Sequence, residues 1–267
     1  MIRIAVALSV FMLLGTVEAR AQGSVFLEEL TWTEVRDEVK AGKTTVLIPT
    51  GGTEQNGPHM ILGKHNIIVR FTAGEIAKQL GNALVAPVVA YVPEGSIDPP
   101  SGHMRFPGTI TLPEEHFAKI LEFAARSFKA HGFLDIVFIG DSGGNQAGQK
   151  TVADRLNKEW ASTQVRVHHA EAYYTANGSD DWLVQQGETV ASIGNHASIP
   201  DTSQLLALYP QGVRRNKLDP GRANDGSGVS GDPTRSSAAY GKKILELKIA
   251  TGVRVIRELR ESSRISR

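Results

Sequence analysis

The sequence contains no cysteine, which excludes disulfide bonds and metal sites built from thiolate ligands. It also lacks an excess of charge of either sign, because the formal net charge is +1 at pH 7. A surface for nucleic acid or for an anionic membrane is normally rich in lysine and arginine, so this balance favours neither partner. Without covalent cross-links, the chain of 267 residues must be stabilised by a buried apolar core.

One apolar stretch runs from Ile4 to Val17, and it is shorter than the ~20 apolar residues that a membrane span needs. Arg3 precedes it, and Ala19-Arg20-Ala21 follows it as a small-residue cleavage site. This pattern predicts a secretory signal peptide at residues 1–21, and therefore an exported protein, periplasmic or secreted. Residues 22–267 are expected to form a single domain, because no linker, repeat or low-complexity tract divides them.

Four short runs rich in β-branched residues alternate with helix-like segments in the mature chain. The runs lie at residues 44–52, 83–95, 135–144 and 164–174, and the helices at 66–80, 114–131 and 146–160. Runs such as Val46-Leu47-Ile48 are apolar without interruption, which is typical of strands buried on both faces. The alternation predicts an α/β fold with a mostly parallel central sheet and helices on both of its faces.

Polar clusters directly follow three of these predicted strands. The carboxyl ends of parallel strands meet at one edge of a sheet, and open α/β folds bind their ligands there. We therefore expect this edge to gather the following side chains: Glu54, His59, His65, Glu94, His103 and Asp141.

The third cluster reads GDSGGN at residues 140–145, close to the GDSGGP that surrounds the nucleophile of trypsin-like proteases. Those proteases are all-β and have a cysteine beside their histidine, so that interpretation fails here. A serine hydrolase of another kind stays open, with Ser142 as nucleophile, because residues 140–144 have the G-x-S-x-G form at a strand-to-helix turn. The backbone N–H groups of Gly143 and Gly144 precede a helix, where they could hold a carboxylate or an oxyanion.

Five stretches, in order along the chain, resemble the creatininase family of metal-dependent amidohydrolases. Residues 49–59 read PTGGTEQNGPH, similar to the family signature P-x-G-S-x-E-Q-H-G-P-H. Residues 106–112, FPGTITL, resemble the family's F-P-G-T-I-S-L, and GDSGGN resembles its N-G-H-G-G-N. The segments at 195–210 and 228–245 resemble two further family motifs. Five ordered matches are a far more specific signal than any one of them.

The resemblance implies a three-layer α/β/α sandwich, usually hexameric, with two ions of zinc or manganese that activate water against cyclic or linear amides. Among the implied metal ligands, this chain keeps Glu54. The other ligand positions hold Asn56 and Ser142 in place of histidines, His65 in place of an aspartate, and Gly144 in place of an acidic residue. A neutral imidazole cannot bridge two cations as a carboxylate can, so the sequence predicts at most one divalent ion.

We predict that Glu54, His65 and Asp141 bind this ion as a two-carboxylate, one-histidine set with an open position for water. His196 lies in the segment where the family's histidine transfers protons during amide cleavage, so it is the predicted catalytic residue. The residues expected to contact or support the substrate are Asn56, His59, Ser142, Gly143 and Gly144.

These features predict an exported, creatininase-like hydrolase that cleaves a C–N bond of a small amide or cyclic amide with metal-activated water. Two alternatives stay open. The chain could be a binding protein that kept the pocket and lost catalysis, or a serine-dependent hydrolase that uses Ser142. The expected partners are a small-molecule amide and, by the resemblance, further copies of the chain in a homo-oligomer; neither nucleic acid nor, after cleavage, a membrane is expected.

Overall fold

The structure, a computed structural model, describes residues 23–221 and 225–265. The predicted signal peptide at residues 1–21 lies outside the described residues, so its cleavage stays a prediction. Within the described ranges, no helix is both long and apolar enough to cross a bilayer.

A four-stranded sheet forms the centre of the molecule. Its strands are β1 (Thr45–Thr50), β2 (Ala83–Val85), β3 (Asp135–Gly140) and β4 (Arg166–His169). They lie in the order β2-β1-β3-β4, and every neighbouring pair is parallel. The predicted parallel sheet is confirmed.

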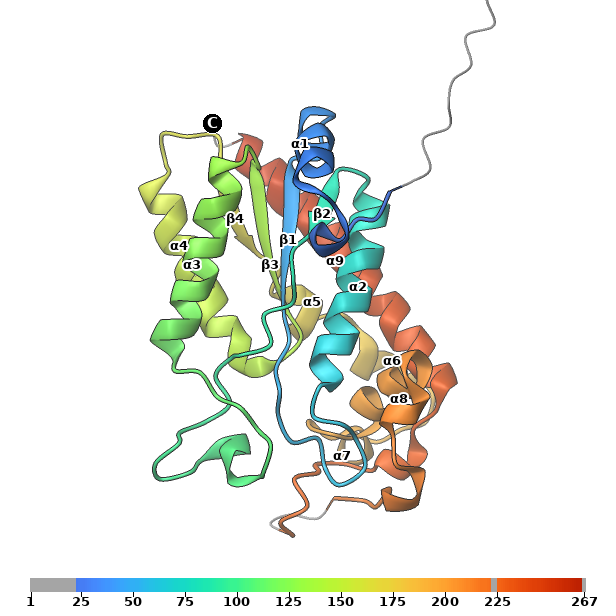
Figure 1. Cartoon of the computed structure of the whole chain (residues 1–267). Coiled ribbons are helices and arrows are strands. Elements are labelled where there is room, and N and C mark those ends of the chain that lie inside the picture. Colours follow the sequence, from blue (N-terminus) through green and yellow to red (C-terminus); the bar gives the residue numbers. More distant parts are fainter. Residues whose placement is uncertain (1–22, 222–224, 266–267) are drawn as a thin grey trace, which may run out of the picture.

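Helices cover both faces of this sheet, as Figure 1 shows. On one face lie α3 (Glu114–Ala130) and α4 (Gln146–Glu159), and on the other α2 (Lys64–Leu80) and α9 (Ala238–Ile265). The alternation of side chains along β1 explains the two layers. Val46 and Ile48 pack in the core beneath α3 and α4, whereas Leu47 packs in the core beneath α2 and α9. The three-layer α/β/α architecture is therefore confirmed.

The strands are shorter than the sequence runs that predicted them. The second run was expected to continue to residue 95, but β2 ends at Val85. Pro87 lacks the N–H group that a ladder needs, and beyond it the chain touches the sheet only through single bridges, such as Thr50 to Val89. The predicted helices agree with α2, α3 and α4 to within two residues at each end.

Smaller helices complete the described chain. Beyond the carboxyl ends of the strands, α6 (Ser179–Gln185), α7 (Val190–Ile193) and α8 (Ile199–Leu208) gather into a lobe below the sheet in Figure 1. The lobe therefore faces the loops that follow β1 and β3. The remaining helices are α1 (Trp32–Lys40), α5 (Ala172–Thr175) and the 3-10 turns Leu27–Glu29, Gly102–Arg105, Gly143–Asn145, Pro210–Gly212, Arg215–Lys217 and Pro233–Arg235.

Candidate functional site

Glu54 stands at the centre of the polar edge of the sheet. It follows β1, and only 2% of the residue is exposed. Three histidines from separate parts of the chain approach its carboxylate. His65 Nε2 lies 2.9 Å from Oε1, His103 Nε2 lies 3.3 Å from Oε2, and His196 Nδ1 lies 3.8 Å from Oε1. Burial opposes ionisation of Glu54, but the positive charges of His65 and Lys64 outweigh it and hold the pKa of Glu54 below its usual range.

A second buried carboxyl group, that of Glu94, faces Glu54. Burial first, and then the neighbouring Glu54 carboxylate, raise the pKa of Glu94 to about 10, so Glu94 is protonated at neutral pH and donates a hydrogen bond to Glu54. This pairing requires glycine at position 52. Gly52 has a φ of 155°, and a Cβ atom there would lie 2.4 Å from Glu94 Oε1.

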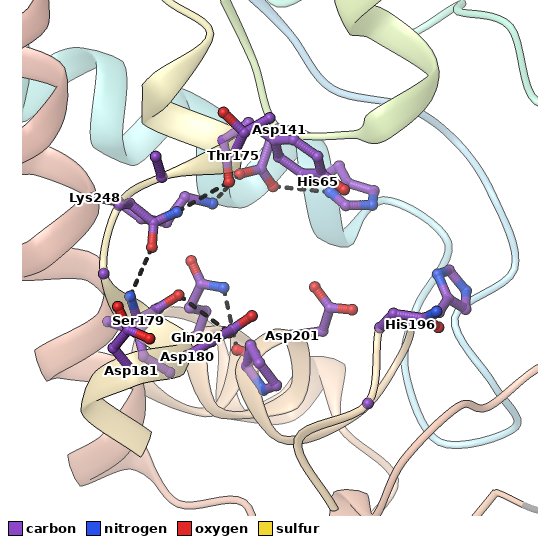
Figure 2. A pocket seen from close by; sticks show the side chains of 18 of the residues that line it. His65, Asp141, Thr175, Ser179, Asp180, Asp181, His196, Asp201, Gln204 and Lys248 are labelled. Carbon is purple, nitrogen blue, oxygen red and sulfur yellow. Dashed lines mark hydrogen bonds and ion pairs between the residues drawn. The ribbon is translucent and has the colours of Figure 1, made fainter. Parts of the chain in front are cut away.

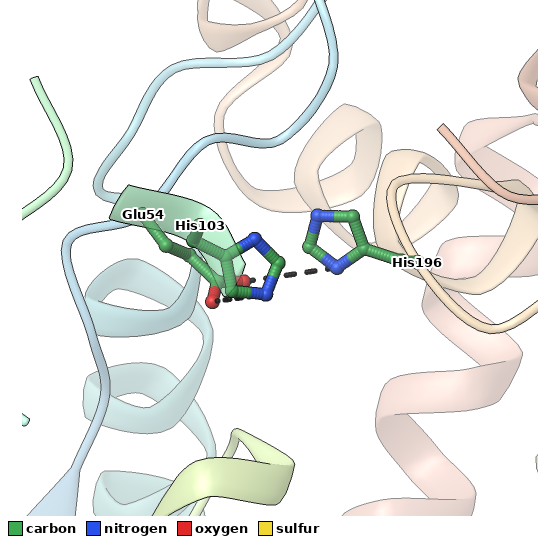
Figure 3. Close-up of side chains that lie close together, drawn as sticks. All are labelled: Glu54, His103 and His196. Atoms are coloured by element: carbon green, nitrogen blue, oxygen red, sulfur yellow. Dashed lines mark ion pairs between the residues drawn. The ribbon is translucent and has the colours of Figure 1, made fainter. Parts of the chain in front are cut away.

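Glu54, His103 and His196 form a candidate metal site (Figure 3). Each offers one ligand atom, and these atoms all lie within 4.8 Å of one another. Burial is the largest cause that lowers the pKa of His103, and burial together with the Lys64 charge lowers the pKa of His196 to about 4. Both rings are therefore neutral at pH 7 and keep a lone pair.

The backbone orients the His196 ring. Its Nε2 lies 3.0 Å from the carbonyl oxygen of Gln55 and 3.0 Å from the side-chain amide nitrogen of Gln55, and in the tautomer with the proton on Nε2 it donates to that carbonyl. Nδ1, on the side of Glu54, is then the nitrogen with the free lone pair. A histidine ligand typically donates its second N–H to a carbonyl in this way, which fixes the tautomer that can bind a cation.

Asp201 holds the loop that carries His196. Its Oδ2 accepts a 2.8 Å hydrogen bond from the backbone N–H of Ala197, whose φ of 52° lies in the left-handed region. Such a backbone is unfavourable for a residue with a Cβ atom and needs support from its surroundings. The other oxygen of Asp201 lies 3.0 Å from Lys64 Nζ, and Lys64 is fully buried. That contact is an ion pair without hydrogen-bond geometry.

His65 is held between two carboxylates. Its Nδ1 lies 2.8 Å from Asp141 Oδ2, and its Nε2 lies 2.9 Å from Glu54 Oε1. Burial and the Lys64 charge oppose protonation, but the two carboxylates outweigh them and raise the pKa of His65. With both nitrogens donating, the imidazolium offers no lone pair. The structure thus brings together the three predicted metal ligands, Glu54, His65 and Asp141, through hydrogen bonds.

Asp141 has a second cation of its own. Lys248 Nζ, from α9, contacts Asp141 Oδ1, and the hydroxyl of Tyr173 donates to the same oxygen at 3.3 Å. Burial raises the pKa of Asp141, but the charges of Lys248 and His65 outweigh this and lower it. Both carboxylate oxygens of Asp141 are therefore engaged by protein groups.

A cavity of about 560 Å³ opens beside these residues (Figure 2). His65, Asp141 and Lys248 line one side, Asp180, Asp181 and Gln204 line the opposite side, and His196 lies at one end. Its volume lies within the range of small-molecule sites. Because His196 belongs both to the cavity wall and to the candidate metal site, a molecule bound in the cavity would reach that site.

Two of the predicted substrate residues are buried away from the cavity. Asn56 Nδ2 donates to the carbonyl oxygens of Glu54 and Ile61 at 2.9 and 3.2 Å, so the side chain braces the loop after β1. His59 is fully buried, and its Nε2 lies 3.0 Å from Thr202 Oγ1 on α8. Neither Asn56 nor His59 is among the described residues that line the cavity.

The predicted serine and glycines lie at the turn after β3. Ser142 is 6% exposed, and the hydrogen bonds of the described residues include none between its Oγ and a histidine. Gly143 is exposed, and a Cβ atom there would lie 3.5 Å from the hydroxyl oxygen of Tyr174. Gly144 lies close against the chain, since a Cβ atom there would lie 2.6 Å from the carbonyl oxygen of Pro93.

The motifs of the sequence assign no function to Lys64 or Lys248. The position of each lysine in the sequence nevertheless indicates that it is buried. Lys248 lies four residues after the buried Ile244 and four before Gly252, on the face of α9 that packs against the core. Lys64 follows a glycine and starts a buried helix. A charged residue at such a position needs a buried partner of opposite charge.

The fold and the site define a class of protein, an α/β/α sandwich with a candidate metal site at the carboxyl edge of a parallel sheet. The family model of creatininase, described as creatinine amidohydrolase, matches residues 28–256. The chain therefore belongs to the creatininase family, and the resemblance seen in the motifs is confirmed.

Two relatives show how far the similarity extends. A mycofactocin precursor peptide peptidase of Mycolicibacterium smegmatis is 29% identical over 221 residues, which cover 74% of this chain and 78% of the relative. A creatinine amidohydrolase of Pseudomonas putida is 26% identical over 204 residues, covering 73% and 76%.

Solved creatininase structures share the fold over nearly their whole length. One mutant creatininase superimposes with a TM-score of 0.75 at 25% identity, covering 89% of this chain and 99% of that one. A second mutant, of a zinc–zinc type, gives a TM-score of 0.69 at 25% identity, covering 88% and 98%.

Proposed function

We propose that this chain is a metal-dependent hydrolase that cleaves a C–N bond of a small amide or cyclic amide. The observation that carries the proposal is the convergence of Glu54, His103 and His196, whose ligand atoms lie within 4.8 Å of one another. One carboxylate and two neutral imidazoles form a donor set found in catalytic zinc sites. The residues present therefore fit a divalent ion, zinc or manganese.

We infer a single ion, and the state of the neighbouring residues supports this. His65 donates from both nitrogens, and Asp141 is engaged by Lys248 and His65. Asn56 is tied to backbone carbonyls. The prediction that His65 and Asp141 bind the ion directly stays a prediction, whereas the geometry favours His103 and His196 beside Glu54.

When bound, the ion supplies a Lewis acid that polarises a carbonyl group and makes water a nucleophile near neutral pH. The protein's own residues prepare the site for it. His65 and Lys64 keep Glu54 ionised, and the Gln55 carbonyl turns His196 Nδ1 toward Glu54. The adjacent cavity would orient the amide, and proximity alone accounts for a large share of many enzymatic rate enhancements.

His196 has two possible roles that exclude each other. Its one free lone pair, on Nδ1, either binds the ion or accepts a proton during cleavage, the role predicted from the sequence. Metal content decides between them. A His196→Asn variant that keeps one ion per chain but loses hydrolysis assigns proton transfer, and a variant that loses both assigns metal binding.

The proposal is tested on protein purified without chelator. We expect about one zinc or manganese ion per chain by elemental analysis, and hydrolysis of at least one member of a panel of linear amides, cyclic amides and short peptides. Peptides belong in the panel because one relative is a peptide peptidase. Glu54→Gln and His103→Asn should lose the ion, whereas His116→Asn, an exposed histidine on α3, should keep it. No ion in the parent, or an ion that survives Glu54→Gln, would refute the assignment.

The second candidate function is a binding protein without catalysis. The observation that favours it is the His65–Asp141–Lys248 network, which neutralises the carboxylates without any metal. Under this candidate the parent binds small amides with equal affinity in the presence of EDTA and hydrolyses none of them. Ser142-dependent hydrolysis is the third candidate. It requires stoichiometric labelling by a fluorophosphonate that is lost in Ser142→Ala.

We also propose that the protein is exported and forms a homo-oligomer. Residues 4–17 and the Ala19-Arg20-Ala21 sequence support export, and the mass of periplasmic protein should then begin near Gln22. The exposed apolar side chains Tyr91, Ile97 and Ile110 support an oligomer. Light scattering after size-exclusion chromatography measures that state.

A further inference from the structure

The side of the cavity opposite His65 and Asp141 carries a hydrogen-bond acceptor without a partner. Gln204, on α8, lines the cavity and is 3% exposed. Its Nε2 donates to the Pro200 carbonyl oxygen at 3.1 Å, which fixes the orientation of the amide group, and its Oε1 has no hydrogen-bond partner. Figure 2 shows this side chain pointing into the cavity. A buried acceptor left without a donor is unfavourable, so this position favours a ligand that donates.

Two carboxylates lie on the same side. Asp180 and Asp181 stand in the first turn of α6 and line the cavity. Within the described residues, neither forms an ion pair with a lysine, arginine or histidine, whereas Asp141 and Asp201, which also line the cavity, each have a lysine. The charges that act most strongly on Asp180 are those of Asp181 and Asp201, both negative. This side of the cavity therefore has negative charge that the described residues do not balance.

We propose that Gln204, Asp180 and Asp181 form a subsite for an ammonium group of the substrate. The inference rests on the proposed hydrolase function and names its substrate class: an amide that carries a primary amine at a distance from the scissile C–N bond. The ammonium group has three N–H donors, one of which would satisfy the free Gln204 oxygen, and its positive charge would offset the neighbouring carboxylates.

An organic cation fits this side better than a metal ion does. Among the described residues, acidic and histidine side chains converge closely enough for a metal only at Glu54, His103 and His196. The carboxylates of Asp180 and Asp181 belong to adjacent residues of a helix, which do not face each other. Their charges can therefore offset that of an organic cation in the cavity without both carboxylates contacting it, whereas a metal ion would need several close ligands.

The continuity of the cavity sets the form of the substrate. His196 lies at one end and Gln204 lines one side, so one molecule can reach both. Its amide would lie beside His196 and its ammonium group beside Gln204. The lysines that line the cavity, Lys64 and Lys248, already have carboxylate partners, so neither leaves an unbalanced positive charge.

The test compares two amides of nearly the same shape, 4-aminobutanamide and pentanamide, which differ in whether the chain ends in an ammonium or a methyl group. Calorimetry on the full mature chain, with zinc and again with EDTA, measures binding of each. We expect the ammonium compound to bind at least about tenfold more tightly, the factor for one charge-assisted contact. The double variant Asp180→Asn, Asp181→Asn should abolish this preference, and Gln204→Leu should reduce it.

The control is Glu115→Gln, because Glu115 is an exposed acidic residue in the first turn of α3 and lies outside the cavity. It should leave the preference unchanged. If Gln204→Leu does not fold, the exposed Asp180 and Asp181 still carry the test. Equal binding of the two amides, or a preference that survives the double variant, would overturn the subsite; so would stoichiometric displacement of the amine by calcium. Hydrolysis of neither amide, with the binding preference intact, would instead count against the proposed catalysis and leave the subsite standing.

Discussion

Removing the charge of Lys248 should destabilise the fold through Asp141. The side chains of Lys248 and Asp141 are 7% and 2% exposed, so their ion pair is buried. Taking away one partner of a buried pair leaves an uncompensated charge and typically costs 3–5 kcal/mol. His65 would remain beside Asp141 in a Lys248→Met variant, so we expect the lower end, about 3 kcal/mol.

The Asp141→Asn variant should cost more, about 4 kcal/mol, because it leaves both Lys248 and His65 without their shared carboxylate. The double variant Asp141→Asn, Lys248→Met removes the anion and one cation together. Residues in direct contact are not additive, so we expect it to cost about 2–3 kcal/mol less than the sum of the single variants.

Urea unfolding with EDTA, followed by circular dichroism, measures these free energies. With a denaturant dependence of about 3 kcal/mol per molar for a chain of this size, the Lys248→Met variant should unfold about 1 M earlier in urea. The same substitution at the half-buried Lys243, about one turn away on α9, should shift the midpoint by less than about 0.2 M. Single variants that each lose less than about 1 kcal/mol, or losses that simply add, would refute the buried network as described.

Three further predictions follow from other contacts. Burial raises the pKa of Asp135, but the hydrogen bond with His168 and the ion pair with Arg260 outweigh it and lower the pKa. The stability that ionised Asp135 contributes is therefore present above about pH 4 and lost as the pH falls below it. The free energy of unfolding of Asp135→Asn should accordingly depend less on pH in acid than that of the parent. Gly52→Ala should cost about 2–3 kcal/mol because it adds a clash with Glu94 to an unfavourable φ, whereas Gly42→Ala, with a φ of 105° and open space, reports the backbone cost alone. His65→Asp places three carboxylates together, so added zinc should raise the melting temperature of this variant more than that of the parent. Adding Asn56→His and Ser142→His should increase this zinc-induced rise further. If zinc raises the melting temperatures of parent and variants equally, these loops cannot form a second ion site.

The sheet and its functional edge could be predicted because they follow from local patterns. Uninterrupted apolar runs such as Ile136-Val137-Phe138 identify buried parallel strands, and parallel strands must bring their carboxyl ends together. That rule alone gathered Glu54, His65 and Asp141, and the structure places Glu54 and Asp141 each within hydrogen-bond distance of His65.

The protonation states of the side chains at that edge could not be predicted, because they depend on groups that are distant in sequence. His65 is an imidazolium because Glu54 and Asp141 meet it on opposite sides, and Asp141 is ionised because α9 delivers Lys248 from the other end of the chain. Likewise, the sequence placed His103 at this edge without showing which atom it presents. The orientation of Nε2 toward Glu54 follows from the 3-10 turn Gly102–Arg105, whose position no local pattern specified.

The charge of the buried set bears on how a single ion would act. Glu54, Asp141 and Asp201 supply three carboxylates, and His65, Lys248 and Lys64 supply three cations in contact with them. The set is therefore balanced without any metal, which explains why carboxylates can stay ionised at 2% exposure. A divalent ion beside Glu54, His103 and His196 would give the set a net positive charge. Negative charge that develops on a carbonyl oxygen during amide cleavage would then be stabilised in a site of low dielectric, where such interactions are strong. A centre with two ions would need additional anions, and at three of the implied ligand positions this chain has Asn56, His65 and Gly144, none of which supplies one.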